Sequence, residues 1–169
     1  NAHGTSTPMN DRSECAAVRA VLPRLDAAGV TLAIENHDRF RARILREILE
    51  TVDSERVGIC LDTVNSFGAL EGPEAVVDAL GPWVVSLHLK DFAIARAPHS
   101  MGFVVEGRPA GEGMLDVPWL LGALARHGRD PNAIIELWTP PEPILADTIV
   151  KELNWVERSI ANLRGCITG

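Results

Sequence analysis

The chain has 169 residues, of which 46% are hydrophobic, and this is enough for a folded domain with a substantial core. Its formal net charge of −7 argues against nucleic acid or an anionic membrane as the main partner. No apolar run approaches the roughly 20 residues that span a bilayer, and three cysteines without a CxxC spacing argue against a disulfide framework. We therefore expect a cytoplasmic protein.

The spacing of apolar residues predicts one helix followed by four strand–helix units. Residues 1–10 are polar and predict a loop, and residues 11–29 predict a leading helix that Pro23 should kink or divide. Residues 30–169 hold the four β-α units, so 1–169 are expected to form a single partial (β/α) barrel domain. The predicted strands are 31–35, 57–61, 84–90 and 133–138, and the helices of these units are 42–52, 73–80, 117–127 and 144–163.

The strands are short and almost continuously apolar, as is typical of parallel strands buried on both faces. The predicted fold class is therefore α/β, with parallel strands and flanking helices. Residues 92–116 are rich in glycine and proline and predict a long loop, and loops of this length tend to be functional.

Each predicted strand leads into a residue that can bind a metal ion. These residues are Glu35, Asp62, His88 and Glu136, at successive spacings of 27, 26 and 48 residues. A β-α unit takes about 30 residues, and parallel strands of a barrel deliver their carboxyl ends to one face, so the four side chains should meet there. Carboxylates suit Mg²⁺ or Mn²⁺, and the imidazole favours Mn²⁺, Co²⁺, Fe²⁺ or Zn²⁺. The absence of a thiolate argues against a structural zinc site.

Each of the four residues also has an ordinary structural explanation. Glu35 could cap the next helix or pair with Arg39, and Asp62 could be a helix N-cap. His88 could be a core histidine with satisfied hydrogen bonds. Glu136 fits such an explanation worst, because an unpaired buried carboxylate is costly unless a cation neutralises it.

Further polar candidates lie just past the strand ends, where a substrate would sit. His37, Lys90, Asp91 and Arg96 could bind substrate oxygens. Lys90 and Asp91 could equally form a structural ion pair, and Arg96 could be a solvated loop residue. Trp138 and Phe67 could form apolar walls for a sugar ring, and plain core packing is the alternative for Phe67.

Five motifs occur together in a fixed order along the chain. They are IENHDRF at 34–40, CLDTVNSF at 60–67, LHLKDF at 87–92, GEG at 111–113 and IELW at 135–138. Together they resemble the xylose-isomerase-like TIM-barrel superfamily of sugar and sugar-phosphate isomerases and epimerases, over about residues 30–165. The resemblance implies the C-terminal half of an eight-stranded barrel, with Mn²⁺, Mg²⁺ or Co²⁺, and sometimes Zn²⁺, bound by Glu35, Asp62, His88 and Glu136.

The resemblance implies an enzyme that isomerises or epimerises a sugar or related polyol through an enediolate. Glu35 and Glu136 would then serve as the catalytic acid and base. Asn65 stands where the ketose epimerases often have a histidine, three residues after the metal-binding aspartate, and Arg41 stands where a further glutamate follows the first ligand by six residues. Both positions lie near substrate in the family, so Asn65 joins the candidate substrate-binding residues and the reaction stays open.

Other functions also stay open. One is a metal-dependent lyase or hydratase of a keto-sugar or keto-glycoside, and another is a non-catalytic fragment or partner subunit. A DNA-repair endonuclease on the same barrel would need more histidines and a basic face. Half a barrel would leave the strands at 31–35 and 133–138 with open edges, so we expect a missing barrel half or a homo-oligomer to cover them.

Overall fold

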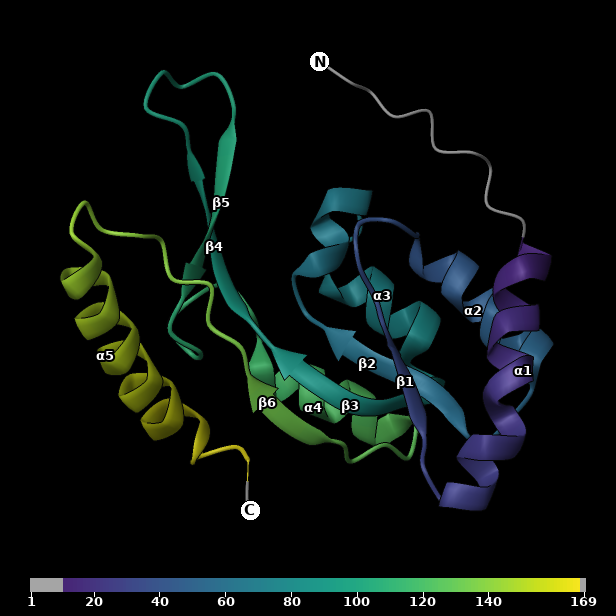
Figure 1. The fold of residues 1–169 in the computed structure, drawn as a ribbon. Coiled ribbons are helices and arrows are strands. Elements are labelled where there is room, and N and C mark those ends of the chain that lie inside the picture. The colour runs from purple at the N-terminus through teal and green to yellow at the C-terminus, as the bar shows by residue number, and fades with distance from the viewer. Residues whose placement is uncertain (1–10, 168–169) are drawn as a thin grey trace.

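The computed structural model describes residues 11–167, so the predicted loop at 1–10 lies outside the described part of the chain. The chain folds as parallel strands with helices between them (Figure 1). In chain order the elements are α1 (Asp11–Ala28), β1 (Leu32–Glu35), α2 (Ala42–Val52), β2 (Val57–Asp62), η1 (Asn65–Ala69), α3 (Pro73–Leu80), η2 (Gly81–Trp83), β3 (Val84–Leu89), β4 (Asp91–Arg96), β5 (Phe103–Arg108), α4 (Val117–Arg126), β6 (Asn132–Ile135) and α5 (Leu145–Leu163).

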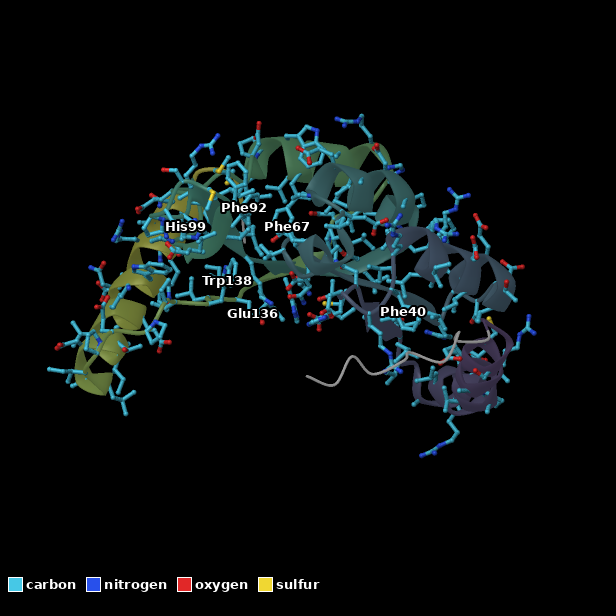
Figure 2. All side chains as sticks on the ribbon, turned by 90° about the horizontal axis from the view of Figure 1, so that it is seen from above. Phe40, Phe67, Phe92, His99, Glu136 and Trp138 are labelled. Carbon is cyan, nitrogen blue, oxygen red and sulfur yellow. The ribbon has the colours of Figure 1, made fainter. Side chains whose placement is uncertain are left out.

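The main sheet has four parallel strands in the order β1-β2-β3-β6. Seen from above, the helices form an outer arc and the strands lie along its inner side (Figure 2). Ile59, Leu61 and Leu87 of the sheet are fully buried, as are Leu120 and Leu124 of α4, and they form the core between the strands and the helices. The predicted fold class, an α/β partial TIM barrel with four parallel strands, is confirmed.

Of the two effects expected of Pro23, a kink or a division of the helix, the division does not occur, because helix α1 runs through the proline from Asp11 to Ala28. A proline inside a helix removes the hydrogen bond to the carbonyl four residues earlier, here that of Arg19. Arg19 is exposed, so water can satisfy its carbonyl. Among residues 11–167, no helix is both long and apolar enough to cross a bilayer.

The prediction of a continuous loop over 92–116 is wrong. β4 and β5 pair there as an antiparallel hairpin, which projects from the carboxyl end of the sheet (Figure 1). The turn closes with a hydrogen bond of 3.1 Å from the Ala97 amide to the Gly102 carbonyl, and Gly102 has a φ of 136°, which favours glycine. Most glycines and prolines of this segment lie in the turn and in the loop after β5. Because they are typical of loops, the two short strands between them could not be recognised from the sequence.

Strand alternation places the chemically important side chains on one face of the sheet. Successive residues of a strand point to opposite faces, so the side of β2 that carries Asp62 also carries Cys60. The register pairs Asp62 with His88 and pairs Cys60 with Glu35. This inner face is turned away from the helices, and at its carboxyl edge the candidate ligands come together.

Candidate metal centre and adjoining pocket

The four candidate ligands come from the carboxyl ends of the four parallel strands. Glu35 and Asp62 end β1 and β2, His88 is the penultimate residue of β3, and Glu136 directly follows β6. One donor atom from each residue lies within 4.8 Å of all the others. An ion bound about 2.0–2.4 Å from each donor would hold the donors within about 4–5 Å of one another. The structure therefore brings these residues together at a spacing that one cation can occupy.

The contacts inside the cluster also fit a cation. The His88 Nδ1 atom lies 2.8 Å from Glu136 Oε2 and 3.7 Å from Glu35 Oε1. Two buried atoms, Asp62 Oδ2 and His88 Nδ1, have ion-pair neighbours but no hydrogen bond of adequate geometry. Buried polar atoms are normally hydrogen-bonded, so the lack of a well-formed hydrogen bond at these two atoms fits a role in coordinating a metal. Three carboxylates and one imidazole suit Mg²⁺, Mn²⁺, Co²⁺ or Zn²⁺.

Asp62 is held rigidly by its neighbours. Its Oδ1 atom accepts hydrogen bonds of 2.8 Å from the backbone amides of Val64 and Asn65, which leaves Oδ2 to face the cluster. The buried Asn36 side chain accepts a 2.7 Å hydrogen bond from the Asp62 amide and donates one of 2.8 Å to the Asp62 carbonyl. Sequence reasoning missed Asn36, although an amide directly after the first ligand, inside a recognised motif, was a signal for it.

Lys90 lies inside the cluster. Its Nζ atom is 2.9 Å from Asp62 Oδ2, 3.0 Å from Glu136 Oε1 and 3.1 Å from Asn65 Oδ1. Burial disfavours its charged form, but the two carboxylates outweigh burial, and the net effect raises the pKa of Lys90. Asn65 also donates a 2.8 Å hydrogen bond to Glu35 Oε1. The cluster therefore combines three carboxylates with one fixed ammonium.

The alternative of a Lys90–Asp91 ion pair is wrong, because Asp91 turns away from Lys90. The Asp91 carboxylate accepts four backbone hydrogen bonds of 2.7–3.0 Å, from Phe92, Gly111, Gly113 and Leu115. A side chain at Gly113 would collide with Asp91, since its Cβ would lie 2.1 Å from Oδ1. Asp91 therefore fixes the loop after β5 through both of its carboxylate oxygens.

A small cavity of about 270 Å³ opens beside the cluster. Its lining includes His37, Asn65, Phe67, Lys90, Val105 and Trp138. Figure 2 shows Glu136 and Trp138 on the inner side of the arc. The cavity is smaller than the roughly 300–1,000 Å³ of pockets for drug-sized ligands, so it suits a small molecule.

Arg96 does not join this cavity. It lies near the tip of the hairpin, where its guanidinium donates a 3.2 Å hydrogen bond to the Ser100 carbonyl and stacks over the Phe103 ring at 5.2 Å. His37 is exposed at the rim and contacts its neighbour Asp38. Sequence reasoning missed Val105, because it lies in the segment that was predicted to be a loop.

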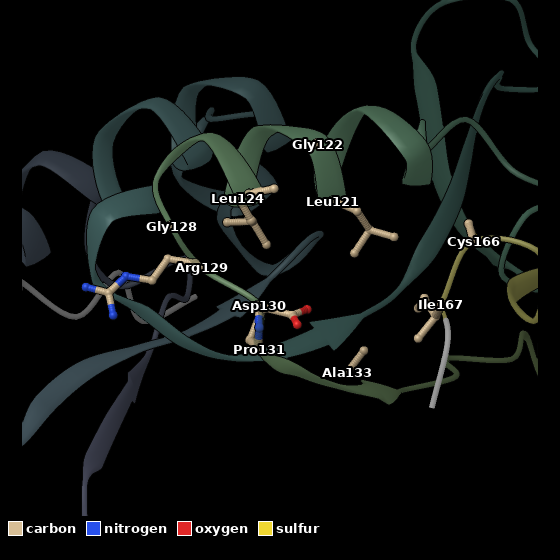
Figure 3. Close-up of a pocket in the computed structure, with 11 residues that line it drawn as sticks. Leu121, Gly122, Leu124, Gly128, Arg129, Asp130, Pro131, Ala133, Cys166 and Ile167 are labelled. Carbon is tan, nitrogen blue, oxygen red and sulfur yellow. The ribbon is translucent and has the colours of Figure 1, made fainter.

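A larger cavity of about 560 Å³ lies elsewhere, between α4, β6 and the C-terminal segment (Figure 3). Its lining includes Leu121, Leu124, Ala133 and Ile167. It begins at Asp130 and Pro131, before the amino end of β6, and so lies at the opposite edge of the sheet from the ligands. None of the four ligands lines it.

Residues 4–164 match the sequence profile of the xylose isomerase-like TIM barrel family. The chain belongs to that family. A curated family relative, 3-oxo-isoapionate decarboxylase of Pectobacterium atrosepticum, is 33% identical over 156 residues, which are 92% of this chain and 56% of the relative. The chain thus spans a little over half the length of this relative.

Solved structures show the same fold. A xylose isomerase-like TIM barrel protein of Mycobacterium smegmatis, in complex with magnesium, aligns with a TM-score of 0.68 at 14% identity, over 96% of this chain and 55% of that one. D-psicose 3-epimerase of Clostridium cellulolyticum H10, with D-tagatose, aligns with a TM-score of 0.66 at 17% identity, over 95% and 58% of the two chains.

Proposed function

We propose that the protein carrying this chain is a divalent-metal-dependent enzyme that forms an enediolate from a small sugar-derived carbonyl compound. The observation that carries the proposal is the convergence of Glu35, Asp62, His88 and Glu136 within 4.8 Å, beside a small cavity. A cation held by these four residues would supply Lewis-acid stabilisation of negative charge on a substrate oxygen. The other parts of the mechanism come from side chains of the chain itself.

Lys90 is the group that most restricts the choice of reaction. Its ammonium is held between Asp62 and Glu136 and lines the cavity, so it presents a fixed positive charge to the substrate. Such a charge can bind a substrate carboxylate, and it can return a proton to a carbanion. Asn65 holds both Glu35 and Lys90 by hydrogen bonds and thereby orients them.

These contacts favour decarboxylation of a 3-oxo sugar acid, a reaction that differs from the lyase or hydratase alternative considered from the sequence. In this reaction the bond between the carboxylate and its neighbouring carbon breaks, and carbon dioxide leaves. The electron pair passes into the adjacent carbonyl to give an enediolate, which takes up a proton from Lys90 or water. The relative at 33% identity is named as a decarboxylase of such a compound, and this supports the proposal.

Isomerisation or epimerisation is the second candidate. Glu35 and Glu136 both approach His88 Nδ1, at 3.7 and 2.8 Å, so two carboxylates are available at the cluster to act as acid and base. The likeness to D-psicose 3-epimerase supports this candidate. Against it, Glu136 Oε1 lies 3.0 Å from the Lys90 ammonium, an ion pair that the carboxylate would have to leave in order to take a substrate proton.

One experiment separates the two candidates. The Mn²⁺-loaded protein is incubated in D₂O with a set of 3-oxo aldonic acids and, separately, with ketoses, while carbon dioxide release and deuterium incorporation are followed. Decarboxylation predicts carbon dioxide from the acids and no exchange in the ketoses. Epimerisation predicts the reverse.

Lysine variants sharpen this test, because the chain has only two lysines. Lys90→Met should abolish carbon dioxide release. Lys151→Met is the matched control, since Lys151 contacts Pro140 and Glu142 away from the cluster. Full activity in Lys90→Met would contradict the role assigned to Lys90.

A further inference from the structure

Val105 on the β4–β5 hairpin lies in the wall of the cavity beside the metal cluster. The other residues of the lining named above come from the loops that follow β1, β2, β3 and β6. Val105 is therefore the residue that the hairpin adds to this cavity, whose other named lining residues follow the parallel strands. It is 37% exposed and so has room to contact a bound molecule.

The hairpin presents one defined face to the cavity. In the β4–β5 ladder Ile94 pairs with Val105, and neighbouring residues along a strand point to opposite faces. Phe92, two residues before Ile94, shares this face and packs edge-on against Phe67 of η1, with ring centroids 4.8 Å apart. Phe67 also lines the cavity, so the face of the hairpin that carries Val105 is the face turned toward the cavity.

The base of the hairpin is fixed relative to the opposite wall. The Trp138 indole donates a 3.1 Å hydrogen bond to the Asp91 carbonyl. Gly107 lies against Trp138 so closely that a Cβ there would be 2.4 Å from the Trp138 carbonyl oxygen. These two contacts join both strands of the hairpin to the segment after β6, and they hold Val105 at a set position relative to Trp138.

We infer that Val105 is a specificity-determining residue, which limits the length of the substrate at the end away from the metal ligands. This inference rests on the proposed function. The polar groups Lys90 and Asn65 lie on the metal side of the cavity, and Val105, Phe67 and Trp138 give it carbon walls. A small cavity with these carbon walls then favours short sugar acids over longer ones.

The test uses a series of aldonic acids as probes: erythronate, xylonate, gluconate and glucoheptonate. Their binding to the Mn²⁺-loaded protein is measured by calorimetry and by quenching of tryptophan fluorescence, for which Trp138→Phe identifies the signal of the cavity. The wild-type protein should bind the shorter acids and discriminate against glucoheptonate. Mn²⁺ affinity is measured for every variant, so that folding and metal binding are controlled separately.

Val104 supplies a matched control. It is the neighbouring residue on the same strand, it is the same residue type, and it is 40% exposed, but it points to the opposite face. Val105→Ala should reduce the discrimination between xylonate and glucoheptonate by about tenfold, a typical effect of removing a few carbon atoms from a pocket wall. Val105→Phe should weaken gluconate binding by at least about tenfold and erythronate binding much less. The same substitutions at Val104 should stay within about twofold of wild type.

The possible failures are distinguishable. If the Val105 and Val104 variants give the same acid preferences while the wild type binds an acid, the role of Val105 is wrong and the proposed function stands. If the wild type binds Mn²⁺ but none of the acids, the proposed substrate class is wrong, and the inference about Val105 fails with it.

Discussion

Asn36 and Asp62 form a closed pair: the Asn36 side chain accepts a 2.7 Å hydrogen bond from the Asp62 amide and donates one of 2.8 Å to the Asp62 carbonyl. Both residues are almost fully buried. The pair joins the loop after β1 to the end of β2, and it fixes the backbone of a proposed metal ligand. Residues that orient ligands in this way commonly contribute 10–100-fold to metal affinity.

Asn36→Leu keeps a similar volume but leaves the Asp62 amide and carbonyl without their partner. We expect a loss of about 1–3 kcal/mol in the free energy of unfolding and a 10–100-fold loss of Mn²⁺ affinity. Denaturant titration and calorimetric Mn²⁺ titration measure the two effects. Asn132→Leu, at the exposed start of β6, is the control and should change neither. Equal Mn²⁺ affinity in Asn36→Leu and wild type would show that Asn36 does not support the metal centre.

Glu136→Gln tests the carboxylate that contacts both His88 and Lys90. The variant keeps the shape of the side chain but loses a charge and a possible base. We expect turnover to fall by several powers of ten, because general acid–base catalysis alone contributes about 10²–10⁴-fold, while part of the Mn²⁺ affinity remains. Steady-state kinetics and Mn²⁺ titration measure these quantities, and Glu142→Gln, which alters an exposed contact with Lys151, is the control. Wild-type turnover in Glu136→Gln would remove this residue from the mechanism.

The ion pair of Glu112 with Arg158 ties the loop after β5 to α5 and predicts a pH dependence. Arg158, together with Asn162, lowers the pKa of Glu112 from its usual 4.5. A lowered pKa means that the contact stabilises the fold above pH 4.5, and that this stabilisation is lost as the pH falls through the folded-state pKa.

Glu112→Gln should therefore lower the thermal midpoint slightly at pH 7 and make no difference near pH 3. The effect should shrink in high salt, because the pair is close to solvent. Thermal unfolding of wild type, Glu112→Gln and the neighbouring control Glu157→Gln at both pH values measures it. A difference that persists at pH 3 would mean that Glu112 acts through something other than its charge.

Open strand edges predict association with further strands. β1 and β6 each pair on one side only in the described sheet, and Ile134 on β6 is 53% exposed. On α5, Leu145, Val150 and Leu153 are 62–74% exposed, which is unusual for a helix of a closed barrel. We expect four additional strands, from the same polypeptide or from a second copy, to cover these surfaces.

Light scattering combined with mass spectrometry under denaturing conditions distinguishes the two sources. A denatured mass well above 18.3 kDa indicates strands in the same polypeptide, and a native mass that is a multiple of the denatured mass indicates a second copy. A stable, metal-binding monomer of 18.3 kDa would contradict the expectation.

Much of the fold could be predicted because buried parallel strands leave a strong pattern. Helices α2 and α3 begin and end where the spacing of apolar residues predicts, and the order of the four parallel strands and the helices between them agrees as well. The hairpin could not be predicted, because its strands are short, partly exposed and surrounded by glycine and proline. The continuity of α1 through Pro23 could not be predicted either, since it depends on the exposure of one helix turn.

In the candidate site, too, some residues could be predicted from the sequence and others could not. Glu35, Asp62, His88 and Glu136 could be predicted to meet, because each ends a parallel strand and such ends share one edge. Val105 could not be assigned a role, because it lies on the unrecognised hairpin. The motif pointed to Asn36, but its partner Asp62 lies 26 residues away and could not be identified from the sequence. Asp91 could be placed just past the end of β3 from the sequence, but the contacts of its carboxylate could not be predicted, because they depend on amides of a loop about 20 residues away.

The central claim is that Glu35, Asp62, His88 and Glu136 bind one divalent cation. The most direct measurement is an anomalous difference map, recorded at the manganese edge, from a crystal of the protein grown with Mn²⁺. We predict one strong peak among the four side chains, about 2.0–2.4 Å from their donor atoms, and no such peak in Asp62→Asn. A map with manganese bound elsewhere and none between these four residues would contradict the account.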